Sequence, residues 1–475
     1  MQLTSNSTGI LSTSKVKATG LSAVDGILDG RKWSTSTLTY SFPALSSTYE
    51  YTGETSNHFQ AYNDAQKAAM RSVLAEYSSV ANLTFVEVAE TTTSHATLRF
   101  AETDAAPTAY AYYPGATAQA GDIWFNSSNG WYDNPVAGNY GRFTFLHEVG
   151  HAVGLKHAHE SDGFGPLPGS LNAMPSTVMS YLSYVGAPIT GSYTNASTSY
   201  AQTLMASDML AIQKIYGANY STNAGDTVYK WLPSSGTTFV NGVAQEATAG
   251  NIIFKTVWDG GGNDTYDLSA YTTQVSINLN PGCWTTTSSS QLANLSGNGT
   301  ILAPGNVANS YLYNNSTKSL IENAIGGAGD DMIIGNVVAN TLSGRAGNDI
   351  IKGFAGDDRL NGGLGIDMLT GGDGKDKFIF NNLADVGDTI TDFKRGKDGI
   401  EISRSGFNLS CESGALSSKY FNATSVATHT GPEFIYDKAT KTLLFDADGS
   451  DASHAIIVAH LTGVSSLSAG DIWLV

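Results

Sequence analysis

The chain has 475 residues, enough for two or three domains, and carries 25 Lys and Arg against 42 Asp and Glu, a net charge of −17. Such an acidic chain is a poor partner for nucleic acid or for an anionic membrane surface. It has only two cysteines, Cys283 and Cys411, no recognisable N-terminal secretory signal and no run of eighteen apolar residues that could span a membrane.

Short strands and helices are expected over the first half of the chain. Residues 1–30 are polar apart from an apolar patch at 23–28 that predicts a small helix. Strands are predicted at 38–42, 84–88, 96–100 and 122–125, and helices at 63–77, 143–153 and 207–216. We therefore expect an α+β multidomain protein, with an α/β unit over residues 31–220 and an all-β half over residues 221–475.

Metal-binding residue types cluster in the helix expected at 143–153. His147 and His151 are four residues apart, so a helix places both on one face, with Glu148 beside them. Gly154 can adopt a positive φ and end the helix, which lets the chain turn back and bring His157 to the same ion. The alternative, packed core histidines, does not explain the glycine and the third histidine at this spacing. The pattern indicates a catalytic zinc site with one position open for water.

The second strong signal is a nine-residue repeat. Its glycines are Gly326, Gly335, Gly344, Gly353, Gly362 and Gly371; the sixth position holds Asp331, Asn340, Asp349, Asp358, Asp367 and Asp376, and the eighth holds Ile333, Leu342, Ile351, Leu360, Leu369 and Phe378. We expect each unit to form a turn of six residues and a strand of three, whose apolar side chain points inward. The alternative, a flexible Gly/Asp-rich linker, requires no fixed spacing. The repeat therefore predicts a parallel β-roll.

The turns of this array crowd carboxylates and bare carbonyls together, which makes a suitable cage for Ca²⁺. We expect carboxylates of successive repeats to approach each other, such as Asp349 with Asp358 and Asp358 with Asp367. A separate copy at residues 259–267 is out of register with the array and predicts either an isolated calcium-binding turn or a first coil. The candidate calcium ligands are Asp259, Gly261, Gly262, Asp264, Gly327, Gly329, Asp331, Asn336, Val338, Asn340, Gly344, Arg345, Ala346, Asp349, Gly353, Phe354, Ala355, Asp358, Gly362, Gly363, Leu364, Asp367, Gly371, Gly372, Asp373 and Asp376.

Taken together, these motifs resemble those of the serralysins, the RTX-bearing metzincin peptidases of Gram-negative bacteria, over most of the chain. Residues 176–181 resemble the Met-turn of metzincins. The resemblance implies that Met179 forms the floor beneath the zinc, and that Tyr181 coordinates zinc at rest and stabilises the oxyanion during catalysis. Ala158 stands where serralysins usually have proline, which we interpret as a change in local rigidity, and His159 beyond it is expected in an exposed loop.

The resemblance also has implications for processing and substrate binding. It implies that residues 1–30 include a short propeptide, and that Tyr110 lies near an edge strand that aligns an extended peptide. Residues 471–475 resemble the C-terminal signal that serralysins present to a type I secretion apparatus. We therefore expect a secreted, extracellular protein, and a monomer.

The predicted function is that of a zinc-dependent endopeptidase acting on proteins or peptides. It would hold one catalytic Zn²⁺ and several structural Ca²⁺, with Glu148 as general base and calcium-dependent folding of the C-terminal part. Two alternatives remain open. One is a dedicated processing peptidase for a cell-surface or S-layer protein; the other is a non-catalytic RTX surface-binding protein with an inert metal site.

Overall fold

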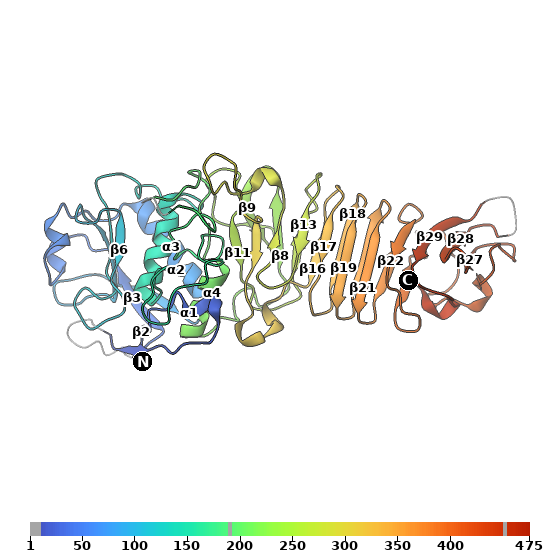
Figure 1. Ribbon diagram of the computed structural model, residues 1–475, viewed down its shortest axis with the longest axis horizontal. Helices are drawn as coiled ribbons and strands as arrows, with labels where there is room; N and C mark the ends of the chain where they lie inside the picture. Colours follow the sequence, from blue (N-terminus) through green and yellow to red (C-terminus); the bar gives the residue numbers. More distant parts are fainter. Residues whose placement is uncertain (1–10, 189–191, 450–453) are drawn as a thin grey trace.

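The computed structural model describes residues 11–188, 192–449 and 454–475. The molecule is elongated, with helices and a small sheet at one end, stacked parallel strands along the middle and antiparallel strands at the other end (Figure 1). Residues 1–10 of the segment predicted to include a propeptide lie outside the described residues.

The N-terminal part contains a five-stranded sheet with strand order β4-β3-β5-β7-β6. Its strands are β3 (Thr37–Ser41), β4 (Thr84–Glu87), β5 (Leu98–Glu102), β6 (Ala109–Ala111) and β7 (Ile123–Phe125), and the helices are α1 (Ser22–Asp25), α2 (Asp64–Val80), α3 (Tyr140–Val153) and α4 (Ala206–Tyr216). A small pair, β1 (Thr13–Lys15) and β2 (Arg31–Trp33), precedes them. Strand β6 is antiparallel to β7 and forms the edge of the sheet. Each helix and strand predicted for this part is present, with ends that differ by a few residues.

Helix α2 shows how this part is packed. Asn63 caps it, in a capping box with Gln66, and Met70, Val73 and Tyr77 bury one face. The Tyr77 hydroxyl donates to Leu146 O at 2.7 Å and so ties α2 to α3. The same core continues into the C-terminal part, where buried aromatic and aliphatic residues near 254–303 join it. The two parts of the chain are therefore packed against each other.

Two long sheets and one short sheet make up the C-terminal part. The first runs β10 (Val243–Ala244), β9 (Ser235–Val240), β8 (Val228–Leu232), β12 (Thr265–Asp267), β16 (Asn323–Ile325), β18 (Thr341–Ala346), β20 (Arg359–Leu364), β22 (Lys377–Phe380), β24 (Gly399–Ile402), β30 (Ile472–Leu474), β25 (Gly414–Ala415). The second runs β13 (Ser276–Asn278), β17 (Met332–Ile334), β19 (Ile350–Ala355), β21 (Met368–Asp373), β23 (Asp388–Ile390), β29 (Ile456–Leu461), β28 (Thr442–Asp446), β27 (Glu433–Asp437), β26 (Phe421–Asn422). The short sheet is β11 (Lys255–Val257), β15 (Val307–Asn309) and β14 (Trp284–Thr285).

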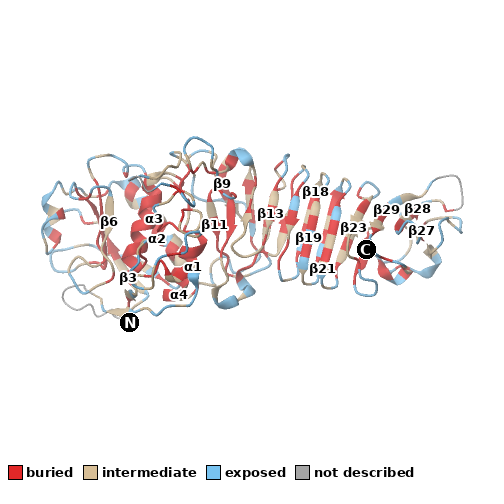
Figure 2. Cartoon of the chain, in the orientation of Figure 1, coloured by how far each residue is buried: buried red, intermediate tan, exposed pale blue. Residues whose placement is uncertain are grey.

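The repeat array forms the predicted parallel β-roll, with its eighth-position side chains fully buried between the two sheets. Figure 2 shows the buried residues along these strands. Two details of the prediction are wrong. Strands β18 to β21 have six residues rather than three, because pairing continues into the turn, as between Ala346 and Leu364.

The pairing of the carboxylates is the second error. Successive repeats lie on opposite sheets, so a full coil takes two repeats, and residues 18 apart become neighbours. Asp349 therefore meets Asp367, and Asp358 meets Asp376, instead of the expected pairs Asp349 with Asp358 and Asp358 with Asp367.

The structure also decides between the two alternatives for the separate copy at 259–267. Strand β12, within this copy, pairs in parallel with β8 and β16, so the copy is an early coil of the same roll.

Cys283 and Cys411 are both free thiols. Within the described residues, no helix is long and apolar enough to cross a bilayer.

Candidate active site

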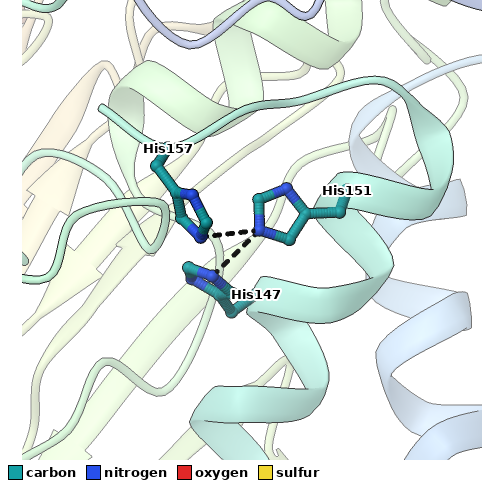
Figure 3. A group of neighbouring side chains, drawn as sticks. All are labelled: His147, His151 and His157. Carbon is teal, nitrogen blue, oxygen red and sulfur yellow. Dashed lines mark hydrogen bonds between the residues drawn. The ribbon is translucent and has the colours of Figure 1, made fainter. Parts of the chain in front are cut away.

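Helix α3 and the turn after it deliver the three histidines. Asn139 caps the start of α3 by accepting a hydrogen bond from Arg142 N. The helix ends at Gly154, which has φ 111° in the left-handed region, a conformation in which a Cβ would lie 2.5 Å from Arg31 O. The chain turns back there, and His157 approaches His147 and His151 from the following loop (Figure 3).

The three imidazoles converge through their Nε2 atoms. His151 Nε2 lies 3.1 Å from His147 Nε2 and 3.0 Å from His157 Nε2. The Nδ1 atoms of His147 and His151 donate to the carbonyls of Val178 (2.7 Å) and Leu155 (2.8 Å), because a carbonyl can only accept. The Nε2 lone pairs of these two residues therefore face each other. That arrangement is repulsive without a cation, and it fits the ligand set of a zinc ion.

Burial keeps these imidazoles in the neutral form that binds metal. It lowers the pKa of His147 to about 3 and that of His157 to about 4, and it lowers the pKa of His151 well below the usual value. His157 also has a carboxylate partner, since its Nδ1 lies 2.6 Å from Glu160 Oε1. Ligating histidines are commonly oriented by such a bond on the other ring nitrogen.

Glu148 lies beside the histidines without a partner for one of its oxygens. Its side chain is buried, and Oε2 has no hydrogen-bond partner among the described residues. Burial raises the pKa of Glu148 to about 8. A carboxyl group in such a position can take up and release a proton near neutral pH.

The segment at 176–181 is held under the histidines by helix α4. Asp208 of α4 accepts hydrogen bonds from Thr177 Oγ1 and from the backbone N–H of Val178. Met179 is fully buried, and its sulfur would lie 2.7 Å from a Cβ at Gly150, so it packs directly against α3. The backbone N–H of Ala158 donates to Met179 O at 3.0 Å, a bond that proline at this position could not make.

Tyr181 faces the histidines from this segment. Its hydroxyl lies 2.7 Å from His157 Nε2, and burial raises its pKa to about 12, so the phenol keeps its proton. His159 is exposed, with its ring centroid 5.4 Å from that of His157. Tyr181 is therefore placed to donate a hydrogen bond at the open side of the site.

The edge strand β6 runs alongside α3. Tyr110, in this strand, donates its hydroxyl to Glu54 Oε1 at 2.8 Å, and two residues beyond the strand the Tyr113 ring meets His151 edge-on at 5.3 Å. Sequence reasoning missed Tyr113, Glu160 and Asp208. Only Glu160 had a local signal, because it follows His157 by three residues.

Comparison with known proteins agrees with this architecture. The family model described as Peptidase M10 serralysin C terminal matches residues 218–473, and the model described as Matrixin matches residues 32–164. The chain is 36% identical to Serralysin G of Dickeya chrysanthemi over 361 residues, which cover 73% of this chain and 68% of that protein. It is 37% identical to Metalloprotease AprA of Pseudomonas entomophila over 358 residues, covering 73% and 67%. For Metallopeptidase AprA of Pseudomonas marginalis the figures are 36% over 321 residues, covering 64% of this chain and 61% of that protein.

The chain belongs to the serralysin family. The prediction from the sequence of a zinc metalloendopeptidase with a metzincin N-terminal part and a sheet-rich serralysin C-terminal part is thereby confirmed.

In the C-terminal part of this serralysin, several buried carboxylates have one oxygen atom that accepts no hydrogen bond from the described residues. Asp367 Oδ1 accepts the N–H of Asp349, and Asp376 Oδ1 accepts that of Asp358, whereas the Oδ2 atoms of all four residues are buried without a partner among the described residues. A Cβ at Gly344 would lie 2.0 Å from Asp349 Oδ2 and 2.6 Å from Gly362 O. Oxygens thus converge where only glycine leaves room, and this cradle fits a hard cation.

Other predicted calcium ligands differ in how well they are satisfied. Asp264 Oδ2 lacks a described partner, while Asp259 accepts hydrogen bonds from Tyr229 and Gly261. Asp331 accepts backbone N–H groups on both oxygens. Asn336 and Asn340 bond each other, which leaves the turn at 336–340 the least in need of a cation.

Proposed function

We propose that this chain is a secreted zinc-dependent endopeptidase in which Glu148 is the general base and the C-terminal part folds with calcium. The observation that carries the catalytic proposal is the convergence of His147, His151 and His157 beside a buried carboxylate oxygen that has no described partner.

The site divides the chemistry of peptide hydrolysis among a few residues. Zinc, when bound by His147, His151 and His157, supplies a Lewis acid that polarises the scissile carbonyl and the attacking water. Glu148 takes the proton of that water and passes it to the leaving amine. Tyr181 would be a fourth zinc ligand at rest, and its hydroxyl would donate a hydrogen bond to the oxyanion once substrate enters. The edge of β6 pairs with the main chain of an extended peptide.

Secretion is proposed from the C-terminus. Residues Ile472 and Leu474 are buried in β30, which pairs with β24 and β25, so the tail is part of the folded sheet. Ile472 and Leu474 could contact a secretion apparatus only before the C-terminal part folds, whereas Trp473 and Val475 stay exposed. Calcium-dependent folding outside the cell provides that order of events.

Replacing His157 by Ala tests the zinc assignment. The variant should lose bound zinc and peptide hydrolysis together, because two nitrogen ligands hold the ion much less tightly than three. Metal content by mass spectrometry and cleavage of an unstructured protein such as casein provide the measurements, with His159→Ala as the matched control. Full zinc occupancy in His157→Ala would contradict the proposed ligand set.

Tyr181→Phe tests the oxyanion role. The variant keeps the ring and loses the hydroxyl, so kcat should fall by about 10- to 1000-fold with little change in KM or thermal stability. Steady-state kinetics on one fluorogenic peptide measure both constants. An unchanged kcat would leave Tyr181 as a packing residue only.

A further inference from the structure

The C-terminal part contacts the zinc-binding helix at the N-terminus of α3. Residues 246–249, which follow β10, are called the clamp here. Ala249 N donates to Ala137 O at 2.8 Å, and Thr248 forms a parallel β-bridge with Ala137. Ala137 precedes the helix cap Asn139 by two residues. The clamp therefore holds the backbone directly ahead of the helix that carries two zinc ligands and Glu148.

A buried cation strengthens this contact. Arg142 lies in the first turn of α3 and is 1% exposed. A positive charge there is unfavourable, because it is removed from water and sits at the positive end of the helix dipole. Two carboxylates compensate: Glu246 Oε2 of the clamp is 3.1 Å from Arg142 Nη2, and Glu76 Oε2 of α2 is 3.4 Å from the same atom. One of the two counter-charges thus comes from the C-terminal part.

The Arg142 guanidinium is held by several fairly long hydrogen bonds. Its contacts to Glu246, Glu76 and Ser72 span 3.1 to 3.4 Å, and Nη1 has no partner among the described residues. A cavity of about 430 Å³, lined by residues of both parts, adjoins it. Without the charge on Glu246, Arg142 would be free to move toward Glu76 or toward the cavity.

We propose that the clamp positions the zinc-binding helix, so that the geometry of the active site depends on the folded C-terminal part through Arg142 and Glu246. Arg142 and Glu246 would act through the position of the helix, as positioning residues. The expected effect on catalysis rests on the proposed function. The expected effect on the order of helix α3 does not. A shift of about 1 Å in a catalytic group can lower a rate by about 100-fold.

The test is Glu246→Gln in the full, calcium- and zinc-loaded chain. Glu412→Gln is the matched control, because Glu412 is exposed and makes no hydrogen bond or ion pair among the described residues. Amide hydrogen exchange over Tyr140–Leu146 should be faster in Glu246→Gln by about 10-fold, with far-UV circular dichroism and zinc content unchanged. Its kcat should fall by about 10- to 100-fold with KM near that of the parent.

Exchange and kcat equal to those of Glu412→Gln would overturn the proposal. A loss of zinc from Glu246→Gln, or a change in its circular dichroism, would overturn it too, because the clamp would then act on metal binding or on overall folding. A parent chain that cleaves no peptide would instead refute the proposed function, and the exchange comparison would still decide the role of the clamp.

Discussion

Glu148→Ala should abolish peptide hydrolysis, with a loss of about 10²- to 10⁴-fold in kcat, while zinc content stays near one ion per chain. The Glu148 carboxylate accepts the proton in the proposed mechanism but is not one of the proposed zinc ligands. Its removal should therefore lower the catalytic rate without lowering zinc binding. Its buried Oε2 makes no hydrogen bond among the described residues, so removing it breaks no hydrogen bond of that atom. Steady-state cleavage of a fluorogenic peptide, together with metal analysis of the same sample, provides the measurement.

Glu160→Ala is the useful comparison for this variant. Glu160 contacts His157 Nδ1, so its loss should weaken zinc affinity and leave the chemical step intact once zinc is in excess. A Glu148→Ala enzyme that remains active with full zinc occupancy would refute the assigned general base.

Removal of calcium should unfold much of the β-roll in the full chain. Burial is the largest cause that raises the pKa of Asp349 and Asp358 to about 7 and that of Asp388 to about 8, and neighbouring carboxylates add to the effect. Near pH 8 without a cation these groups must either ionise in a buried, repulsive site or let the strands separate. Far-UV circular dichroism during a calcium titration from chelator should show β-structure appearing at high-micromolar to millimolar calcium.

Magnesium is the control, because it is smaller and requires a tighter octahedral shell than these carbonyl-lined turns provide. The pH dependence has a defined sign. Since the folded-state pKa values lie above the unfolded value of about 3.9, the metal-free roll should be more stable near pH 5 and lose stability as the pH rises through about 7. A roll that is fully folded in chelator near pH 8, or that responds equally to magnesium, would contradict the calcium switch.

The three converging histidines could be located from the sequence because their directions follow from local geometry. His147 and His151 share a helix face, and Gly154 permits the reversal that brings in His157. Asp208 could not be found in this way, since it lies 31 residues from Thr177 and meets it only through the packing of α4. Tyr113 likewise reaches His151 only because β6 runs beside α3.

The roll was predictable in its core and not in its pairing. The inward direction of Leu342 or Ile351 follows from the repeat itself, and both are fully buried. The pattern of one inward apolar residue per repeat is the same in two arrangements. The next repeat can add a strand to the same sheet, or it can cross to the facing sheet. The sequence separation of neighbouring carboxylates was therefore underestimated by one repeat.

That crossing places a constraint on how such a chain can change in length. Each nine-residue unit contributes one strand to one sheet, the next unit adds a strand to the other sheet, and the chain returns to the first sheet 18 residues on. Loss or gain of two units shortens or lengthens the rod by one layer and leaves every later strand on its own side. Loss of a single unit would transfer all later strands, β30 at the C-terminus included, to the wrong side. The array can therefore lengthen or shorten only in pairs of units.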